Sequence, residues 1–382
     1  MQMEKDYFTP YGTFTLERDN DEDKTLRAWD ASDIYALETF QADYESTLNK
    51  DNLNITIFND SFGALTCAFA KHKIECVSDS FSAHTVIKSN LGQNLLSREN
   101  MIFTSSSSDL ENNPDIIFLK IPKNNNYLEY LLQKINRNID PGVSVIGLGM
   151  TRNIHSSTVE LFEYYLGDVK TSLAKKKARL VFGKTKVSVK NLVDYPVEFS
   201  VPEFNLDLVN NANGFSFGMM DFGTLFFLEH FPRFKNQPEK VIDLGCGDGS
   251  LALLAAEKWP ESPILCVDDS YLAVESAKEN FISNGYEGRA DFKVTDCLAG
   301  IDAKSADLIL CNPPFHEYHA VSMGIAGKMF KDAHRVLKTD GSLFVVKNKH
   351  LGYQSYLEKL FGECKTIAGN KKYEILKAVK TK

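Results

Sequence analysis

The sequence repeats itself once, and this duplication constrains the fold more than any other feature. Three pairs of segments match in the same order along the chain: residues 74–83 with 264–273, 115–118 with 307–310, and 175–181 with 370–376. Similar blocks in one order with nearly constant spacing indicate a duplicated domain. At 382 residues, the chain is long enough for two domains that each bury their own core.

Short apolar runs alternate with helical stretches, which is typical of βαβ units. Strand-like runs in the first copy lie at residues 55–58, 74–77, 115–119 and 143–146, and residues 127–138 form a helical stretch between two of them. This alternation predicts an α/β protein of two tandem Rossmann-like domains with doubly wound, mostly parallel sheets. We expect domains at residues 1–190 and 236–382. The linker between them, at residues 191–235, is expected to cover the active site as well.

Polar residues suited to a nucleoside follow three successive strands of the second copy. The first of these strands, at residues 241–242, leads into a glycine-rich turn at residues 243–249. In such a turn the backbone can approach a ligand closely. Asp268 can accept both hydroxyls of a ribose, and Asp296 can accept from an adenine amino group. Ser250 replaces the last glycine of a dinucleotide site, so S-adenosylmethionine fits better than NAD. The predicted cofactor-binding residues are Asp243, Gly245, Cys246, Gly247, Asp268 and Asp296.

The next strand, at residues 307–311, stops at two prolines that cannot continue a ladder of hydrogen bonds. The side-chain oxygen of Asn312 and the carbonyl of Pro313 can accept both hydrogens of a planar exocyclic amine, and Phe315 can stack on its ring. A lone strand-end aspartate is often only a helix cap, and this tetrapeptide alone could be only a turn. The strand-end aspartates together with residues 312–315 favour a catalytic site. The predicted catalytic residues are Asn312, Pro313, Pro314 and Phe315. We expect His316 to be a packing residue, and we assign no general base.

The net charge of −8 argues mildly against a nucleic-acid partner, but the charge is unevenly distributed. Residues 170–190 contain eight lysines and arginines and no acidic residue. We predict that this segment contacts phosphates, although lysines that protect an exposed edge strand would give the same pattern. The predicted substrate-binding residues are Lys175, Lys176, Lys177, Arg179 and Phe215. Phe215 would cover the base of the substrate, and ordinary packing is the alternative role for this side chain.

The composition also limits the compartment and the ligands. The seven cysteines include no Cys-x-x-Cys pair, which favours a reducing environment and no bound metal. The chain starts without a secretion signal and has no apolar run of membrane-spanning length, so we expect a cytoplasmic protein without a membrane partner.

The first copy has lost the residues that carry chemistry in the second. Ser78 stands in the place of Asp268, Lys120 in the place of Asn312, and only Gly63 remains of the glycine-rich turn. We therefore predict that the first domain is a degenerate copy that serves as a scaffold or binds RNA.

Together these motifs resemble the class I S-adenosylmethionine-dependent methyltransferases, and specifically the duplicated bacterial enzymes that methylate guanine N2 in ribosomal RNA. Besides the glycine-rich turn, the segments that carry the resemblance are residues 27–33, 59–65, 154–158, 174–180, 211–223 and 312–316. The pattern is more similar to members acting on 23S RNA than on small-subunit RNA. The resemblance implies an inactive first domain, a catalytic second domain, and an unpaired or flipped guanine of large-subunit ribosomal RNA as the acceptor.

Other functions remain open from the residues alone. A small-subunit RNA enzyme, a protein-glutamine methyltransferase and a DNA adenine-N6 methyltransferase would use a similar pocket, because each acceptor is a conjugated amine. The glutamine enzyme would not need the basic segment. A non-catalytic RNA-binding protein would not need Asp268, Asp296 and Asn312 together. Guanine is preferred to adenine only through the resemblance.

Overall fold

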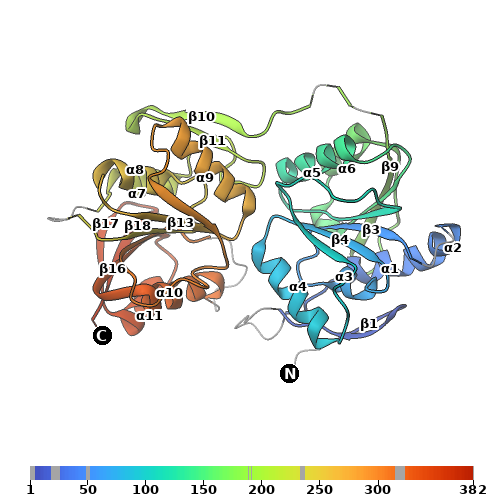
Figure 1. Cartoon of the computed structure of the whole chain (residues 1–382), viewed down its shortest axis with the longest axis horizontal. Coiled ribbons are helices and arrows are strands. Elements are labelled where there is room, and N and C mark those ends of the chain that lie inside the picture. Colours follow the sequence, from blue (N-terminus) through green and yellow to red (C-terminus); the bar gives the residue numbers. More distant parts are fainter. Residues whose placement is uncertain are drawn as a thin grey trace. The chain divides into compact units, whose positions relative to one another are not determined.

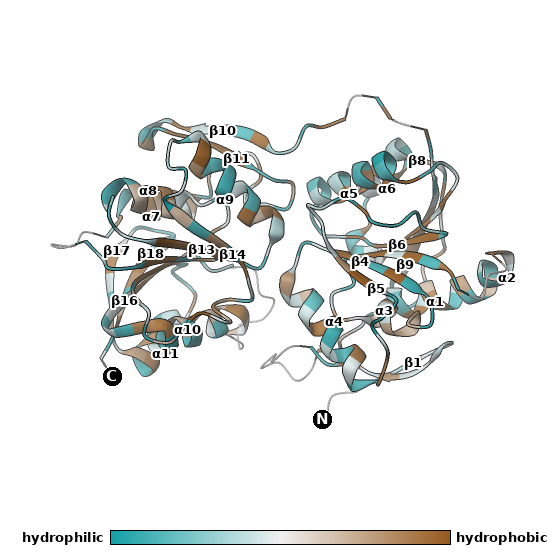
Figure 2. Cartoon of the chain, in the orientation of Figure 1, coloured by the Kyte–Doolittle hydropathy of each residue, from teal (hydrophilic) through white to brown (hydrophobic). Residues whose placement is uncertain are grey.

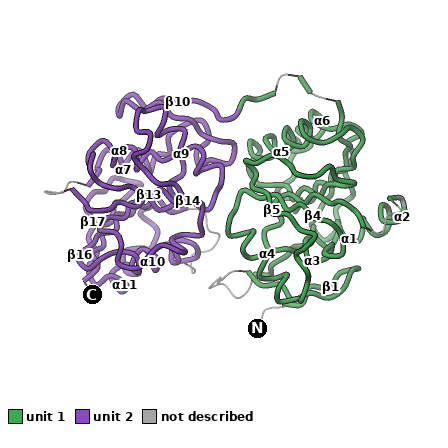
Figure 3. The backbone as a smooth tube through the Cα atoms, viewed as in Figure 1, with its two compact units in different colours: residues 1–194 green, residues 195–382 purple. Residues whose placement is uncertain are grey.

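The chain forms two compact units, Met1–Asp194 and Tyr195–Lys382 (Figure 3). In this computed structural model the described residues are 5–18, 26–48, 52–187, 189–190, 192–232, 237–314 and 323–381. The boundary between the units falls inside the segment expected to be a linker, residues 191–235. The described residues of that segment from 195 onward belong to the second unit, where they include two strands and a helix.

The first unit is built on a seven-stranded sheet in the order β5-β4-β3-β6-β7-β9-β8. Strands β3, β4 and β9 of this sheet are labelled in Figure 1. Strands β3 to β7 are parallel, and β8 and β9 are antiparallel to their neighbours. Its strands are β1 (Asp6–Thr9), β2 (Gly12–Thr15), β3 (Asn54–Phe58), β4 (Lys73–Ser78), β5 (Met101–Ser105), β6 (Ile116–Lys120), β7 (Ser144–Met150), β8 (Leu166–Thr171) and β9 (Ala178–Thr185). Its helices are α1 (Ala31–Asp43), α2 (Glu45–Leu48), α3 (Ala64–Ala68), α4 (Phe81–Gln93), α5 (Asn125–Asn138), the 3-10 turn η1 (Thr151–Asn153) and α6 (Ser156–Tyr165).

The second unit repeats this topology, with a seven-stranded sheet in the order β14-β13-β12-β15-β16-β18-β17. Strands β12 to β16 are parallel, and β17 and β18 are antiparallel. Its strands are β10 (Val197–Val201), β11 (Leu206–Asn210), β12 (Val241–Leu244), β13 (Ile264–Asp268), β14 (Ala290–Val294), β15 (Ala306–Cys311), β16 (Leu337–Asn348), β17 (Gly362–Gly369) and β18 (Tyr373–Lys380). Its helices are the 3-10 turn η2 (Pro202–Phe204), α7 (Phe222–Glu229), α8 (Ser250–Lys258), α9 (Tyr271–Ser283), α10 (Gly324–Val336) and α11 (Tyr353–Phe361).

Each face of the second sheet carries its own apolar core. Helices α7, α8 and α9 pack on the face that presents Leu310 and Phe344, whereas α10 and α11 pack on the face of Cys311 and Val345. The strands at the centre of both sheets are strongly hydrophobic in Figure 2, because both of their faces are covered. The predicted fold class and duplication are therefore confirmed, and the four strand-like runs of the first copy fall on β3, β4, β6 and β7.

Within the described ranges, no helix has the length and apolar character needed to span a bilayer. Those ranges also contain no group of three or more His, Cys, Asp or Glu side chains arranged to hold a metal ion.

Candidate active site

The glycine-rich turn between β12 and α8 adopts a backbone that only glycine accepts easily. Gly245, Gly247 and Gly249 have φ angles of +73°, +55° and +80°, in the left-handed region. A Cβ atom at Gly249 would lie 3.0 Å from the Cβ of Ala277 on α9, so this glycine also allows close helix packing. At Gly247 a Cβ would meet nothing within 4 Å, which leaves the backbone of the turn open to a ligand.

Asp268 lies at the end of β13 and is fixed by the backbone on both sides. Its Oδ2 accepts a hydrogen bond from the N–H of Gly247 at 3.0 Å, and its Oδ1 accepts from Ser270 N–H at 2.9 Å. Burial raises the pKa of Asp268, while these two N–H donors oppose the shift. The carboxylate is thus held against the glycine-rich turn, where the hydroxyls of a ribose can reach it.

Asp243 supplies a buried acceptor that the chain leaves unused. Its Oδ2 accepts from the N–H of Ala252 in α8 at 3.1 Å, but its Oδ1 has no hydrogen-bond partner among the described residues. Burial raises the pKa of Asp243 well above its ordinary value. An unpaired buried carboxylate oxygen is costly, and a bound ammonium group would satisfy it. The open turn, Asp268 and Asp243 together therefore fit S-adenosylmethionine, which carries a ribose and an ammonium group.

Asp296 follows β14, as expected, but it is not free. Its carboxylate forms an ion pair with the ammonium of Lys328 on α10. One of its two oxygens is therefore already engaged, and contact of Asp296 with an adenine amino group remains a prediction. The thiol of Cys246 in the glycine-rich turn is buried, and its pKa is raised well above its ordinary value by hydrogen bonding to Cys266 and by burial.

Asn312 lies directly after β15. Its amide nitrogen is held by two hydrogen bonds, and its amide oxygen has no partner among the described residues. The Nδ2 group donates to Thr224 Oγ1 at 2.8 Å and to Asp221 Oδ2 at 3.1 Å. The Oδ1 atom is buried and has no partner among the described residues. Because both anchors hold the nitrogen, the amide cannot turn over without losing them, and the oxygen stays presented as an acceptor.

The two anchors of Asn312 come from the start of α7. Asp221 is the N-cap of this helix and also accepts from the N–H of Thr224 at 2.8 Å. Both residues belong to the segment that the sequence predicts to cover the site, residues 191–235, but neither is predicted there to anchor Asn312. The Asp-x-x-Thr spacing signals a helix start, but nothing in the sequence indicates that it faces a residue 88 positions away from Thr224.

The remaining predicted residues of the second unit are placed only in part. Pro313 is buried and Pro314 is exposed. Phe315 and His316 lie outside the described residues, so the predicted stacking residue is not placed. Phe215 keeps 46% of its surface exposed, and its role in covering a substrate remains a prediction.

The basic residues lie in and beside the hairpin of β8 and β9 in the first unit. Lys176 and Lys177 are exposed at its tip and both have positive φ angles. Lys175 forms an ion pair of 2.6 Å with Glu38 and lies 5.4 Å from the ring centre of Tyr35. Arg179 is half-buried. Lys175, Lys176 and Lys177 are thus all exposed, Lys175 is engaged with Glu38, and contact of this set with phosphates remains a prediction.

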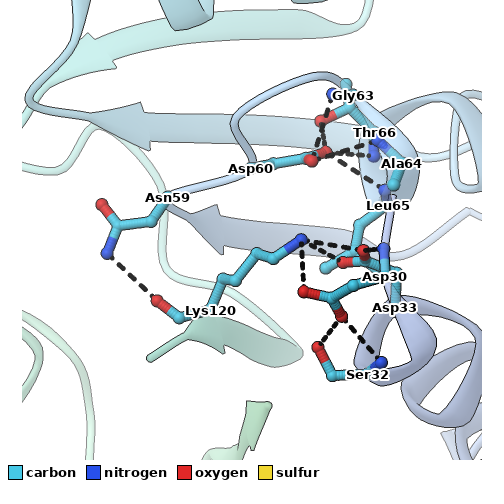
Figure 4. Close-up of polar contacts among 10 residues, drawn as sticks. All are labelled: Asp30, Ser32, Asp33, Asn59, Asp60, Gly63, Ala64, Leu65, Thr66 and Lys120. Carbon is cyan, nitrogen blue, oxygen red and sulfur yellow. Dashed lines mark hydrogen bonds and ion pairs between the residues drawn. The ribbon is translucent and has the colours of Figure 1, made fainter. Parts of the chain in front are cut away.

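The first unit fills the position of Asn312 with an ion pair (Figure 4). In the first unit Leu119 pairs with Phe58, and in the second Cys311 pairs with Leu244 at the equivalent place in the sheet. Lys120, the residue after Leu119, therefore corresponds to Asn312. Its ammonium donates to both oxygens of Asp33 at 2.7 and 2.8 Å and lies 3.9 Å from Asp30.

Asp30 is the N-cap of α1 and Asp33 is three residues further, so they correspond to Asp221 and Thr224. The same framework thus holds the amide of Asn312 in one unit and an internal ion pair in the other.

The glycine-rich turn is also filled in the first unit. Asp60 stands where the second unit has Cys246, and its carboxylate lies at the start of α3. At 2.8 to 3.1 Å, it accepts hydrogen bonds from four successive backbone N–H groups, those of Gly63, Ala64, Leu65 and Thr66. This part of the first unit therefore offers its amides to its own side chain.

The strand order, the open glycine turn and the strand-end carboxylate define the second unit as a class I methyltransferase domain. Residues 4–187 match the family model described as the RLMG N-terminal domain, and residues 205–377 match the methyltransferase small domain. Ribosomal RNA large subunit methyltransferase G of Psychromonas ingrahamii is 39% identical over 94% of this chain and 94% of its own length. The protein of that name from Aliivibrio fischeri strain MJ11 is 42% identical over 93% and 92%. The chain belongs to the family of ribosomal RNA large subunit methyltransferase G.

A solved structure shares the fold over almost the whole chain. It is the T. thermophilus 16S rRNA N2 G1207 methyltransferase in complex with AdoMet and guanosine, with a TM-score of 0.76 and 20% identity. The match covers 98% of this chain and 97% of that one. At this level of identity the likeness establishes the tandem arrangement of the fold.

Proposed function

We propose that this protein transfers the methyl group of S-adenosylmethionine to the exocyclic N2 amine of a guanine in 23S ribosomal RNA. Membership in the family supports a large-subunit RNA substrate. The observation that carries the chemistry is the open Oδ1 of Asn312, a buried acceptor whose amide is fixed by two anchors. Such an atom is suited to hold one hydrogen of an amine.

The cofactor would be held by residues of β12 and β13 and of the turn that follows β12. Asp268 would accept from the ribose hydroxyls, Asp243 Oδ1 would accept from the ammonium group, and the turn at Gly247 would lie against the nucleoside. When bound, S-adenosylmethionine supplies an electrophilic sulfonium methyl group.

The chain's own contribution to the reaction is positioning. The lone pair of the guanine amine is delocalised into the ring, so the amine is a weak nucleophile. Asn312 Oδ1 and the Pro313 carbonyl would accept its two hydrogens and direct the lone pair toward the methyl group. Orientation of this kind can lower a barrier by up to roughly 7–11 kcal/mol. The amine loses a proton after it becomes cationic, so no strong base is needed.

A guanine inside folded RNA must be unpaired or flipped out to reach this pocket. Phe315 would stack on the base, a contact worth on the order of 1–3 kcal/mol, and Phe215 would cover it. The exposed Lys176 and Lys177 of the first unit would contact phosphates, with an affinity that falls steeply with salt. The first unit would act as scaffold and RNA-binding module, and the enzyme would work in the cytoplasm.

The test is methyl transfer from labelled S-adenosylmethionine to bacterial ribosomal RNA and subunits that lack the modification. Label in N2-methylguanosine of 23S RNA, lost in Asn312→Ala while the variant still binds the cofactor, is the expected result. Isothermal calorimetry with S-adenosylmethionine checks that binding. Label in 16S RNA, protein or DNA, or no transfer at all by the wild-type protein, would overturn the proposal.

A further inference from the structure

A second buried amide oxygen lies at the same edge of the sheet as Asn312. Asn348 is the last residue of β16, the strand that pairs with β15. Its Oδ1 atom is buried and, like that of Asn312, has no hydrogen-bond partner among the described residues. No role for Asn348 is apparent from the sequence, and the chemistry proposed above does not use this residue.

The register of the sheet places the two amides on one face. Strands β15 and β16 are parallel with Cys311 beside Val345, so Asn348 lies two residues beyond the level of Asn312. The side chains of Leu310 and Val346 belong to the core under α7, and alternation along each strand puts Asn312 and Asn348 on that same face. Strand geometry then separates their Cα atoms by ~8 Å, a distance that two side chains can span around one base.

Aromatic side chains lie close to Asn348 in the sheet. Asn348 pairs across the sheet with Tyr373, which is buried and stacks on Phe226 of α7. Lys372 lies over the rings of Tyr373 and Phe222, at 5.0 and 5.9 Å. A polar atom left unpaired beside such side chains destabilises the protein unless a ligand supplies a donor.

We propose that Asn348 Oδ1 accepts the N1–H of the target guanine while Asn312 holds its N2 amine, and that this contact selects guanine over adenine. The inference rests on the proposed function. Guanine presents two adjacent donors, N1–H and the N2 amine, which match two acceptor oxygens. Adenine presents its amine beside an unprotonated N1, which would face the oxygen of Asn348 as a second acceptor and be repelled.

The first unit supports this assignment by what it lacks. Its β6 and β7 pair with Leu119 beside Gly147, so Met150 is the counterpart of Asn348. The copy in which Lys120 replaces Asn312 therefore also has an apolar side chain in place of the second acceptor. Both acceptors are present in one unit and both are absent from the other.

Primer extension on the labelled 23S RNA first locates the methylated guanosine. The test then uses a short RNA that contains this guanosine, and the same RNA with 2-aminopurine at that position. 2-Aminopurine keeps the N2 amine but has no N1–H. We expect the wild-type protein to prefer guanosine by on the order of 10²-fold in kcat/KM, because the analogue leaves the acceptor unpaired. Asn348→Leu should reduce this preference to a few fold, mainly by losing activity on guanosine. Asn348→Asp, which keeps an acceptor, should retain the preference.

Met150→Leu is the matched control in the first unit and should retain the wild-type preference. Cofactor binding by each variant, measured by calorimetry, shows that the second unit is folded. If Asn348→Leu keeps the wild-type preference, or Asn348→Asp loses it, the inference is wrong while the proposed function stands. If the wild-type protein methylates no guanosine in any RNA, the proposed function itself fails, and the inference with it.

Discussion

The two units share a strand order and a turn geometry, but they differ in how the polar groups at the carboxyl edge of the sheet are satisfied. In the second unit, Asp243, Asn312 and Asn348 each keep a buried oxygen without a partner in the described chain. The counterparts in the first unit are Ile57, Lys120 and Met150. Two are apolar, and Lys120 is paired internally. The fold itself therefore does not need these acceptors, and ligand binding is the role that we propose for them.

The largest effect is expected when the ion pair of the first unit is moved into the second. Asn312→Lys combined with Thr224→Asp should lower methyl transfer by more than about 10³-fold, because the amine acceptor is replaced by a paired ammonium. Calorimetry should show that S-adenosylmethionine still binds. The reverse exchange, Lys120→Asn with Asp33→Thr, is the matched control and should leave transfer unchanged. Substantial transfer by the first double variant would show that the Asn312 acceptor is dispensable.

The second test removes the cation of the first unit. Lys120→Met leaves the carboxylate of Asp33 buried without its partner and should destabilise the unit by about 3–5 kcal/mol in urea unfolding. Lys120→Met combined with Asp33→Leu should recover most of the loss, since no buried charge then remains. If the single variant were as stable as the wild type, the ion pair would contribute nothing to the fold.

The pH dependence of this variant has a defined sign. Burial raises the pKa of Asp33 to about 6, although Lys120 opposes the shift. The folded protein therefore binds more protons at Asp33 than the unfolded chain between its ordinary pKa of 3.8 and about 6, and stability falls as the pH rises through that range. Without Lys120 the folded pKa rises further, so the stability of Lys120→Met should keep falling above pH 6. Unfolding curves on both sides of that pH check this.

The third and smallest effect concerns the cofactor. Asp268→Asn should weaken S-adenosylmethionine binding by roughly 10- to 100-fold, the loss expected for a charge-assisted hydrogen bond to ribose. Calorimetry measures the affinity directly. Ser78→Ala, the matched change in the first unit, should leave it unchanged. Equal affinities for wild type and Asp268→Asn would remove the carboxylate from the cofactor site.

The fold could be predicted from the sequence because its signals are local or repeated. Apolar runs marked the strands, glycines marked the turn at Gly245, and collinear blocks marked the duplication. Asn312 could be identified because the prolines after it end a strand. The partners of these residues could not be predicted, because tertiary packing brings them together. Asp221 anchors Asn312 from 91 residues away, and Asp33 pairs with Lys120 from 87 residues away.

The carboxylate of Asp60 bears on the number of cofactor molecules that one chain can bind. It sits on the amides at the start of α3 as an anion that belongs to the chain itself. A tethered group of this kind has a local concentration in the millimolar range or above, and it never diffuses away. A free ligand would have to compete with it at every encounter. The amides at the start of α3 are therefore permanently occupied, and Ser78 and Ile57 stand in the places of Asp268 and Asp243, so we expect one S-adenosylmethionine per chain.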